Sequence, residues 1–164
     1  MNADFTTSTW FTYIDLDLQK MVVLAYKLLE QQEVSLERFD DYSFIVFPMA
    51  KAYEGFLKTF LLKTELINDF TYNDRRFRIG RALNPDVSPR HRDHFWLYDD
   101  VARYCSAAVA REMWETWLAC RNRVFHYFPK HRQVLTLSQA REYLKRMETS
   151  MHQAVTCEIS IGKG

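Results

Sequence analysis

Apolar residues recur at intervals of three and four along most of the chain, a spacing that places them on one face of an α-helix. The pattern is clearest where Ile45, Met49 and Phe56 share a face. Four glycines and four prolines among 164 residues also favour long helices. The pattern predicts four long helices: from Asp15 or Asp17 to about Gln32, from Asp40–Ser43 to about Lys63, from about Asp99 to His126 or Tyr127, and from a Ser138 cap onward.

The rest of the chain shows weaker or interrupted patterns. Pro48 marks either the first turn of the second helix or a kink in it, because proline lacks the amide hydrogen that a helix interior uses. Gly55 costs a helix about 1 kcal/mol relative to alanine, which indicates close packing against a neighbour. Between Glu65 and His94 the sequence RRFRIGRALN predicts a short helix, followed by a loop. The tail CEISIGKG fits either a small strand or a frayed end.

Four long helices joined by one irregular crossover predict an all-α protein, an up-and-down bundle of four to five helices. A chain of 164 residues can bury a core without disulfides or metals, so we expect a single domain over residues 1–164. The third helix is apolar on more than one face, from Val101 through Met113 to Leu118. A bundle core needs one apolar face per helix, so the surplus indicates either a homodimer interface or a central position within the monomer.

Composition narrows the class of protein. Hydrophobic residues make up 48% of the chain and charged residues 26%, as in soluble globular proteins. No uncharged run reaches the roughly 18 residues of a membrane span, and the first residues lack a secretory signal, so we expect a cytoplasmic protein without membrane contact. Cys105, Cys120 and Cys157 are odd in number and far apart, which argues against a disulfide framework and against a Cys-x2-Cys zinc site.

Positive charge is concentrated in one segment, although the net charge is only +1. Between Arg75 and His94 lie six arginines and two histidines against two aspartates. Such a segment can hold a phosphate backbone locally, although it also fits a solvated helix face and loop. Arg75, Arg76 and Arg78 are therefore candidate RNA contacts, together with Arg123 further along the chain.

The residues with the clearest chemistry lie near the end of the third predicted helix, in the sequence RNRVFH. A guanidinium holds a phosphate through two parallel hydrogen bonds, and an imidazole moves a proton near neutral pH. Arg121 and His126 therefore suit metal-free cleavage of an RNA phosphodiester, with Asn122 on the same helical face as His126 to orient its ring. Basic residues also gather at helix C-termini for electrostatic reasons, so a purely structural role stays open.

Arg121 and His126 do not converge on a regular helix. Five residues leave the two side chains about 140° apart around the helix axis. They reach one phosphate only if the helix ends or distorts between them, or if a second subunit supplies one of the groups. Pro129 disfavours helical geometry at Phe128, so we expect the helix to end near His126 or Tyr127.

The Arg-Asn-x3-His motif, at the end of a long helix in a small bundle, resembles the HEPN superfamily. The motif of that family is an arginine, usually followed by a polar residue, with a histidine about four to six residues later. Arg121, Asn122 and His126 match these positions. Many stand-alone toxin members have a tyrosine two residues after the histidine, whereas this chain has Tyr127 next to it and then Phe128.

The segment MAKAYEGFLKTFLL is similar to the second helix of HEPN domains in ribonuclease LS-type toxins. In such enzymes an acidic residue on an earlier helix joins the arginine and the histidine, and Glu54 is the matching residue. Glu54 and Lys58 also form an i,i+4 pair in the favoured orientation, which is the ordinary interpretation of such a pair.

The resemblance implies a metal-independent endoribonuclease that cleaves single-stranded RNA through attack by the 2′-hydroxyl. Many HEPN members are homodimers of toxin–antitoxin or phage-defence systems, so we expect an RNA substrate, a homodimer, an antitoxin partner, and neither cofactor nor metal. Two alternatives stay open. One is a non-catalytic HEPN-like module that binds a nucleotide or a protein, and the other is a structural bundle in which the motif only ends a helix.

Overall fold

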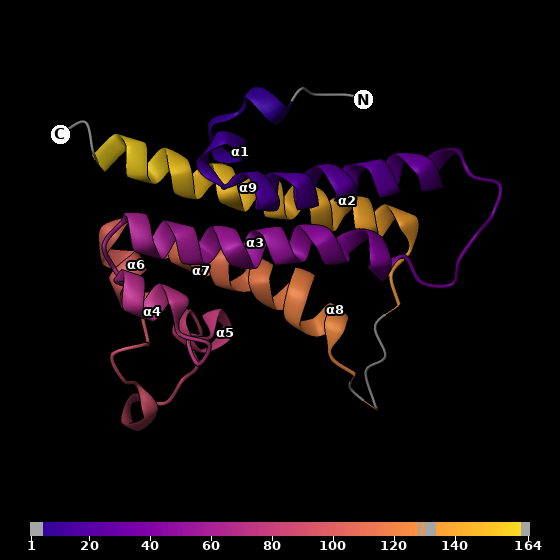
Figure 1. Cartoon of the computed structure of the whole chain (residues 1–164). Helices are drawn as coiled ribbons and strands as arrows, with labels where there is room; N and C mark the ends of the chain where they lie inside the picture. Colours follow the sequence, from indigo (N-terminus) through magenta and orange to yellow (C-terminus); the bar gives the residue numbers. More distant parts are fainter. Residues whose placement is uncertain (1–4, 128, 130–133, 162–164) are drawn as a thin grey trace.

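The chain is an all-α protein in the computed structural model, which describes residues 5–127, 129 and 134–161. It has about eight helices, five of them with seven or more residues, and no strand within these described residues (Figure 1). The all-α part of the predicted fold class is therefore confirmed. The elements are 3-10 turns at Phe5–Thr7 and Pro89–His91, a π turn at Leu118–Asn122, and α1 Thr9–Tyr13, α2 Leu16–Val34, α3 Ser43–Lys63, α4 Asp69–Asn73, α5 Ile79–Ala82, α6 Tyr98–Tyr104, α7 Ala107–Trp117, α8 Arg123–Phe125 and α9 Leu137–Ile161.

The first two predicted helices are α2 and α3, which lie side by side along much of their length (Figure 1). Asp15 caps α2, because its side chain accepts the amide hydrogen of Leu18 at 2.9 Å. The close packing predicted at Gly55 is confirmed, since a Cβ there would lie 2.6 Å from Leu18 Cδ2. Helix α3 begins at Ser43, five residues before Pro48, so the proline does not mark the first turn.

The third predicted helix is not continuous, contrary to the prediction. It divides into α6 and α7 at Cys105 and Ser106, and the Ser106 hydroxyl caps α7 by accepting an amide hydrogen at 3.2 Å. Serine favours this position over a helix interior because its hydroxyl satisfies a free backbone donor. Helix α7 then passes through the π turn into α8, which ends at Phe125, with His126 extended. The predicted end near His126 is thus confirmed, whereas Phe128 lies outside the described residues.

The C-terminal helix α9 packs against α1, α2, α3 and α7. It continues to Ile161, so neither a strand nor a frayed end begins at Cys157; residues 162–164 lie outside the described residues. Cys157 forms a disulfide with Cys105, and their Cα atoms lie 5.8 Å apart. The argument against disulfides was therefore wrong, because the end of α9 lies beside the corner between α6 and α7. Cys120 is free and buried.

The crossover between α3 and α6 contains α4, α5 and a short turn, and it hangs below α3 in Figure 1. The short helix predicted here is reduced to the single turn α5. Gly80 of α5 lies against Trp117, since a Cβ on Gly80 would come within 2.2 Å of the Trp117 ring. The indole rings of Trp114 and Trp117 are buried. The monomer itself therefore covers part of the second apolar face of the third predicted helix.

A buried hydroxyl ties three of the long helices together. Tyr53 of α3 is fully buried, and its hydroxyl lies 2.7 Å from Ser150 Oγ of α9 and donates to the Met113 carbonyl of α7 at 3.2 Å. Burial raises the pKa of Tyr53 well above its usual range. None of the helices in the described part of the chain is long and apolar enough to cross a membrane.

Candidate functional site

The π turn is the local feature that changes the direction of the motif side chains. The backbone N–H of Arg123 bonds the Leu118 carbonyl, five residues back rather than the four of an α-helix. Together with the end of α8, this wider turn allows Arg121 to reach His126 across a separation of about 140° on a regular helix. One chain therefore unites the two groups without a residue from a second subunit.

Glu54, Arg121 and His126 form a contiguous cluster between α3 and the end of α8. Arg121 Nε donates to Glu54 Oε2 at 3.0 Å, and Arg121 Nη1 lies 3.4 Å from His126 Nε2. The side chains of Arg121 and Glu54 are 31% and 28% exposed, and His126 is exposed. All three side chains are therefore in contact with solvent. Glu54 takes Arg121 as its ion-pair partner, not Lys58.

An aromatic surface supports the Arg121 guanidinium. Its Cζ lies 5.4 Å from the centre of the Trp117 ring, within the range of a cation–π contact. Trp117 in turn stacks on Trp114, with ring centres 5.6 Å apart and planes inclined by 17°. Glu54 from one side and Trp117 from another thus restrict the orientation of the guanidinium.

The arrangement leaves hydrogen-bonding capacity for a ligand. A guanidinium has five N–H donors, and Arg121 directs Nε–H to Glu54 and one Nη1–H toward His126. The remaining donors on a partly exposed side chain suit an anionic oxygen. Because a guanidinium only donates, His126 Nε2 accepts in this contact and carries no proton there, as a general base requires.

The two other predicted residues of the motif do not join the cluster. The Asn122 amide makes no hydrogen bond to any residue that the structure describes, so the predicted contact with the His126 ring is absent there. The reason is that His126 has left the helix, and the i,i+4 relationship no longer applies. Arg123 is exposed and lines a groove whose lining includes none of the cluster residues.

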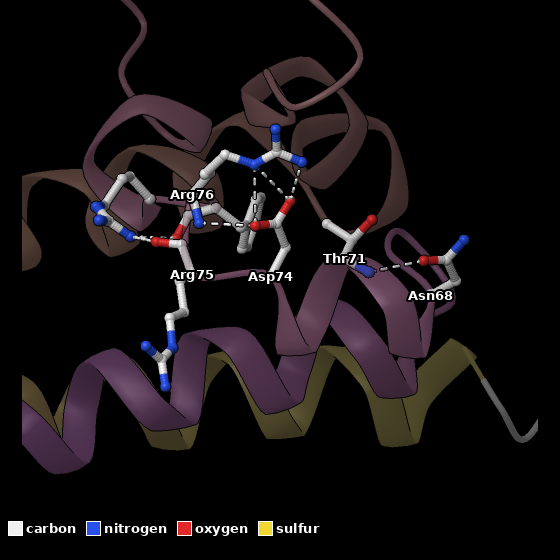
Figure 2. Close-up of polar contacts among 7 residues, drawn as sticks. Asn68, Thr71, Asp74, Arg75 and Arg76 are labelled. Atoms are coloured by element: carbon white, nitrogen blue, oxygen red, sulfur yellow. Dashed lines mark hydrogen bonds and ion pairs between the residues drawn. The ribbon is translucent and has the colours of Figure 1, made fainter.

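The arginines of the crossover differ in their availability to RNA. Figure 2 shows Arg76 bound to Asp74 through its backbone N–H and through two guanidinium nitrogens, with Nη2 at 3.1 Å from Oδ2. Hydrogen bonds from Arg76 hold the pKa of Asp74 below its usual range. Arg78 donates to the Arg75 carbonyl. Arg75 is exposed, points away from Asp74 in Figure 2, and has no ion pair with a described residue.

Sequence reasoning missed the part that Trp117 plays in the cluster. Trp114 and Trp117 are both buried in the core. Trp117 also carries Arg121, and the only signal for this in the sequence is their i,i+4 spacing. Within the described ranges, no three side chains among His, Cys, Asp and Glu gather as metal ligands would. Comparisons of the chain with family models, with curated proteins and with solved structures found no match.

Proposed function

We propose that the protein is a metal-independent endoribonuclease of the HEPN type that cleaves single-stranded RNA. The observation that carries the proposal is the convergence of Glu54, Arg121 and His126 on one accessible point of the surface. Two of these residues belong to the sequence motif, and the third lies 67 positions earlier on α3. A structural role for the motif would not require a carboxylate, a guanidinium and an imidazole to meet in the open.

In the proposed reaction the 2′-hydroxyl oxygen of a ribose attacks the adjacent phosphorus. His126 Nε2 removes the hydroxyl proton, and the free N–H groups of Arg121 stabilise the negative charge on the non-bridging oxygens. The bond from phosphorus to the 5′-oxygen breaks, and this oxygen takes a proton from solvent. The products are a 2′,3′-cyclic phosphate and a 5′-hydroxyl. Glu54 positions the guanidinium and does not contact the reacting atoms.

The charge around the cluster supports an anionic substrate. Lys51 and Lys58 lie three residues before and four residues after Glu54, so all three share one face of α3. The Nζ atoms of Lys51 and Lys58 lie 5.8 and 5.7 Å from the ring centres of Phe47 and Phe77. Glu54 offsets one positive charge, and the face of α3 remains net positive.

The resemblance to HEPN proteins supports the finer parts of the proposal. These parts are an up-and-down bundle topology, a homodimer, and a role as a toxin in a toxin–antitoxin or phage-defence system. Under this proposal an antitoxin protein restrains the enzyme, and expression without it arrests growth. Sedimentation analysis tests the dimer, and induced expression of the wild type beside His126→Ala tests the toxicity.

The decisive assay follows the cleavage of a fluorescent single-stranded RNA by the purified protein in EDTA. We expect Arg121→Ala and His126→Ala each to abolish cleavage, with products that end in a 2′,3′-cyclic phosphate. Glu54→Ala should slow cleavage less, and Glu54→Gln should retain more activity because its amide oxygen still accepts from Arg121 Nε.

Matched controls are an arginine and a histidine outside the cluster. Arg103 is ion-paired with Asp100, and His152 is exposed on α9, so Arg103→Ala and His152→Ala should cleave like the wild type. A strand with 2′-deoxyribose at the cleaved position should stay intact. Cleavage that persists in His126→Ala, or that leaves 3′-hydroxyl ends, would contradict the mechanism.

A second candidate is a non-catalytic module that binds a nucleotide or a protein. The ion pair between Glu54 and Arg121 favours it, because a paired guanidinium can serve packing alone. This candidate predicts that no RNA is cleaved and that a bound nucleotide raises the melting temperature. It also predicts that Arg121→Ala lowers the free energy of unfolding. Glu54→Ala and the double variant should lower this free energy by the same amount as Arg121→Ala, because each removes the same ion pair.

A further inference from the structure

A groove of about 490 Å³ lies between α7, the π turn, α9 and the crossover. This volume falls in the range of about 300 to 1,000 Å³ that holds small ligands. Arg111 and Trp114 of α7 line the groove, with Tyr98 from α6, Arg146 from α9 and Arg123 from α8. Four helices, the π turn and the crossover therefore contribute to it, and none of the lining residues belongs to the Glu54–Arg121–His126 cluster.

The groove offers cations that are not already neutralised. Arg111 and Arg123 are exposed, and neither has a hydrogen bond or ion pair from its side chain to a residue in the described ranges. Arg146 is ion-paired with Glu112 at 3.2 Å and lies 3.7 Å from Glu115 of the lining, so its charge is offset. Asp86 is the other carboxylate of the lining. The lining thus holds three arginines against two carboxylates, and its two exposed arginines without a described partner favour an anionic ligand.

Aromatic side chains connect the groove to the candidate site. Trp114 lines the groove and stacks on Trp117, and the Arg121 guanidinium lies over Trp117. Tyr98 adds a second ring to the lining. Arginines beside aromatic rings are the combination that holds single-stranded nucleic acid, because the cations bind phosphates and the rings stack on bases.

The spacing of the two unpaired arginines indicates the length of the ligand. Arg111 and Arg123 are twelve residues apart, which corresponds to about 18 Å along a helix. That distance suits two phosphates of one strand better than a single phosphate. We propose that the groove binds the nucleotides of single-stranded RNA beside the cleaved phosphodiester, with Arg111 and Arg123 on two backbone phosphates and a base against Tyr98. This inference rests on the proposed function for the identity of the ligand.

The test measures binding separately from cleavage. The probe is a fluorescein-labelled 2′-O-methyl RNA of eight nucleotides, which has no free 2′-hydroxyl to react. Its affinity is measured by fluorescence anisotropy at several salt concentrations for the wild type and for Arg111→Gln/Arg123→Gln. We expect binding about tenfold weaker in the double variant, and a dependence of log K on log salt that is shallower by about 1.4. Adenosine monophosphate should compete weakly, because it carries one phosphate group.

The control variant Arg38→Gln/Arg103→Gln removes the same charge from exposed arginines outside the groove and should bind like the wild type. Equal affinity and salt dependence in the groove variant and the wild type would overturn the inference, as would competition by the mononucleotide at the affinity of the strand. The proposed function is tested apart from it by His126→Ala, which should bind normally. If binding depends on the groove arginines but no RNA is cleaved, the proposed binding site stands and the proposed nuclease activity is refuted.

Discussion

Gly80→Ala is the substitution that best tests how the aromatic surface under Arg121 is held. A Cβ on Gly80 would lie 2.2 Å from Cη2 of Trp117 and 2.8 Å from its Cζ2, closer than unbonded carbons approach. The indole cannot move away freely, because it is 7% exposed and stacks on Trp114. Overpacking of a core lowers the free energy of unfolding by about 1 to 3 kcal/mol. The higher helix propensity of alanine offsets less than about 1 kcal/mol of this loss, because α5 is a single turn.

We therefore expect Gly80→Ala to lower the free energy of unfolding by about 1 to 2 kcal/mol. For a protein of this length the melting temperature should fall by about 2 to 8 °C. Urea denaturation followed by tryptophan fluorescence and by circular dichroism measures both the loss and the cooperativity. Since Trp117 supports Arg121, the RNA cleavage that we propose should also fall at temperatures where the variant is fully folded.

Gly55→Ala is the matched control for this experiment. Its Cβ would also be close to a neighbour, 2.6 Å from Leu18 Cδ2, but the atoms that it meets belong to the flexible end of a half-buried leucine. Alanine also gains about 1 kcal/mol over glycine inside a long helix, so the net change should stay within about 1 kcal/mol of zero. Equal stability of Gly80→Ala and the wild type would refute the rigid packing of Trp117. Unchanged cleavage in a destabilised Gly80→Ala would refute its support of Arg121.

Three further predictions concern the cysteines and a buried tyrosine. The Cys105–Cys157 disulfide closes a loop of 52 residues, so its reduction should lower the free energy of unfolding by up to about 4 kcal/mol. A phosphine reductant should therefore lower the melting temperature of the wild type and leave that of the double serine variant unchanged. Burial raises the pKa of the Cys120 thiol to about 12, so Ellman's reagent at pH 8 should detect no thiol in the native protein and one after unfolding. Burial also raises the pKa of Tyr53. The free energy of unfolding should therefore be unaffected by this group below pH 10 and should fall above it by about 1.4 kcal/mol per pH unit, because the unfolded tyrosine ionises first. Absorbance at 295 nm should then show Tyr53 ionising only together with unfolding.

The hydrophobic period was sufficient to predict α2, α3 and α9, because each has one continuous apolar face. It could not predict the break at Ser106, where the apolar pattern runs on through the cap and only the serine hydroxyl marks the new helix start. The pairing of Cys105 with Cys157 was equally hidden, because 52 residues separate them and only the packing of α9 brings them together. Features that depend on one helix face could thus be predicted from the sequence, and features that depend on contacts between two distant elements could not.

The same distinction applies to the candidate site: residue types predicted part of it, and contacts between distant elements supplied the rest. The chemistry of Arg121 and His126 was evident from residue types, and Glu54 entered only through the resemblance to a known family. The π turn has no counterpart in the spacing of apolar residues, because it inserts one extra residue into a helix whose two flanks keep their own patterns. The contact between Trp117 and Arg121 could be anticipated only once both were known to be on the same helix face.

The ion pair between Glu54 and Arg121 is compatible with binding a phosphate, although it neutralises a charge. Glu54 accepts from Nε, the donor nearest the backbone, so the two terminal nitrogens keep all their N–H donors except the one that Nη1 directs toward His126. A guanidinium that is only 31% exposed would otherwise lose part of its hydration without compensation and adopt several rotamers. Trp117 and Glu54 restrict it to one orientation before a substrate arrives, so less entropy is lost on binding. The same pair that would serve a structural helix end therefore also orders the group that meets the transition state under the proposed function.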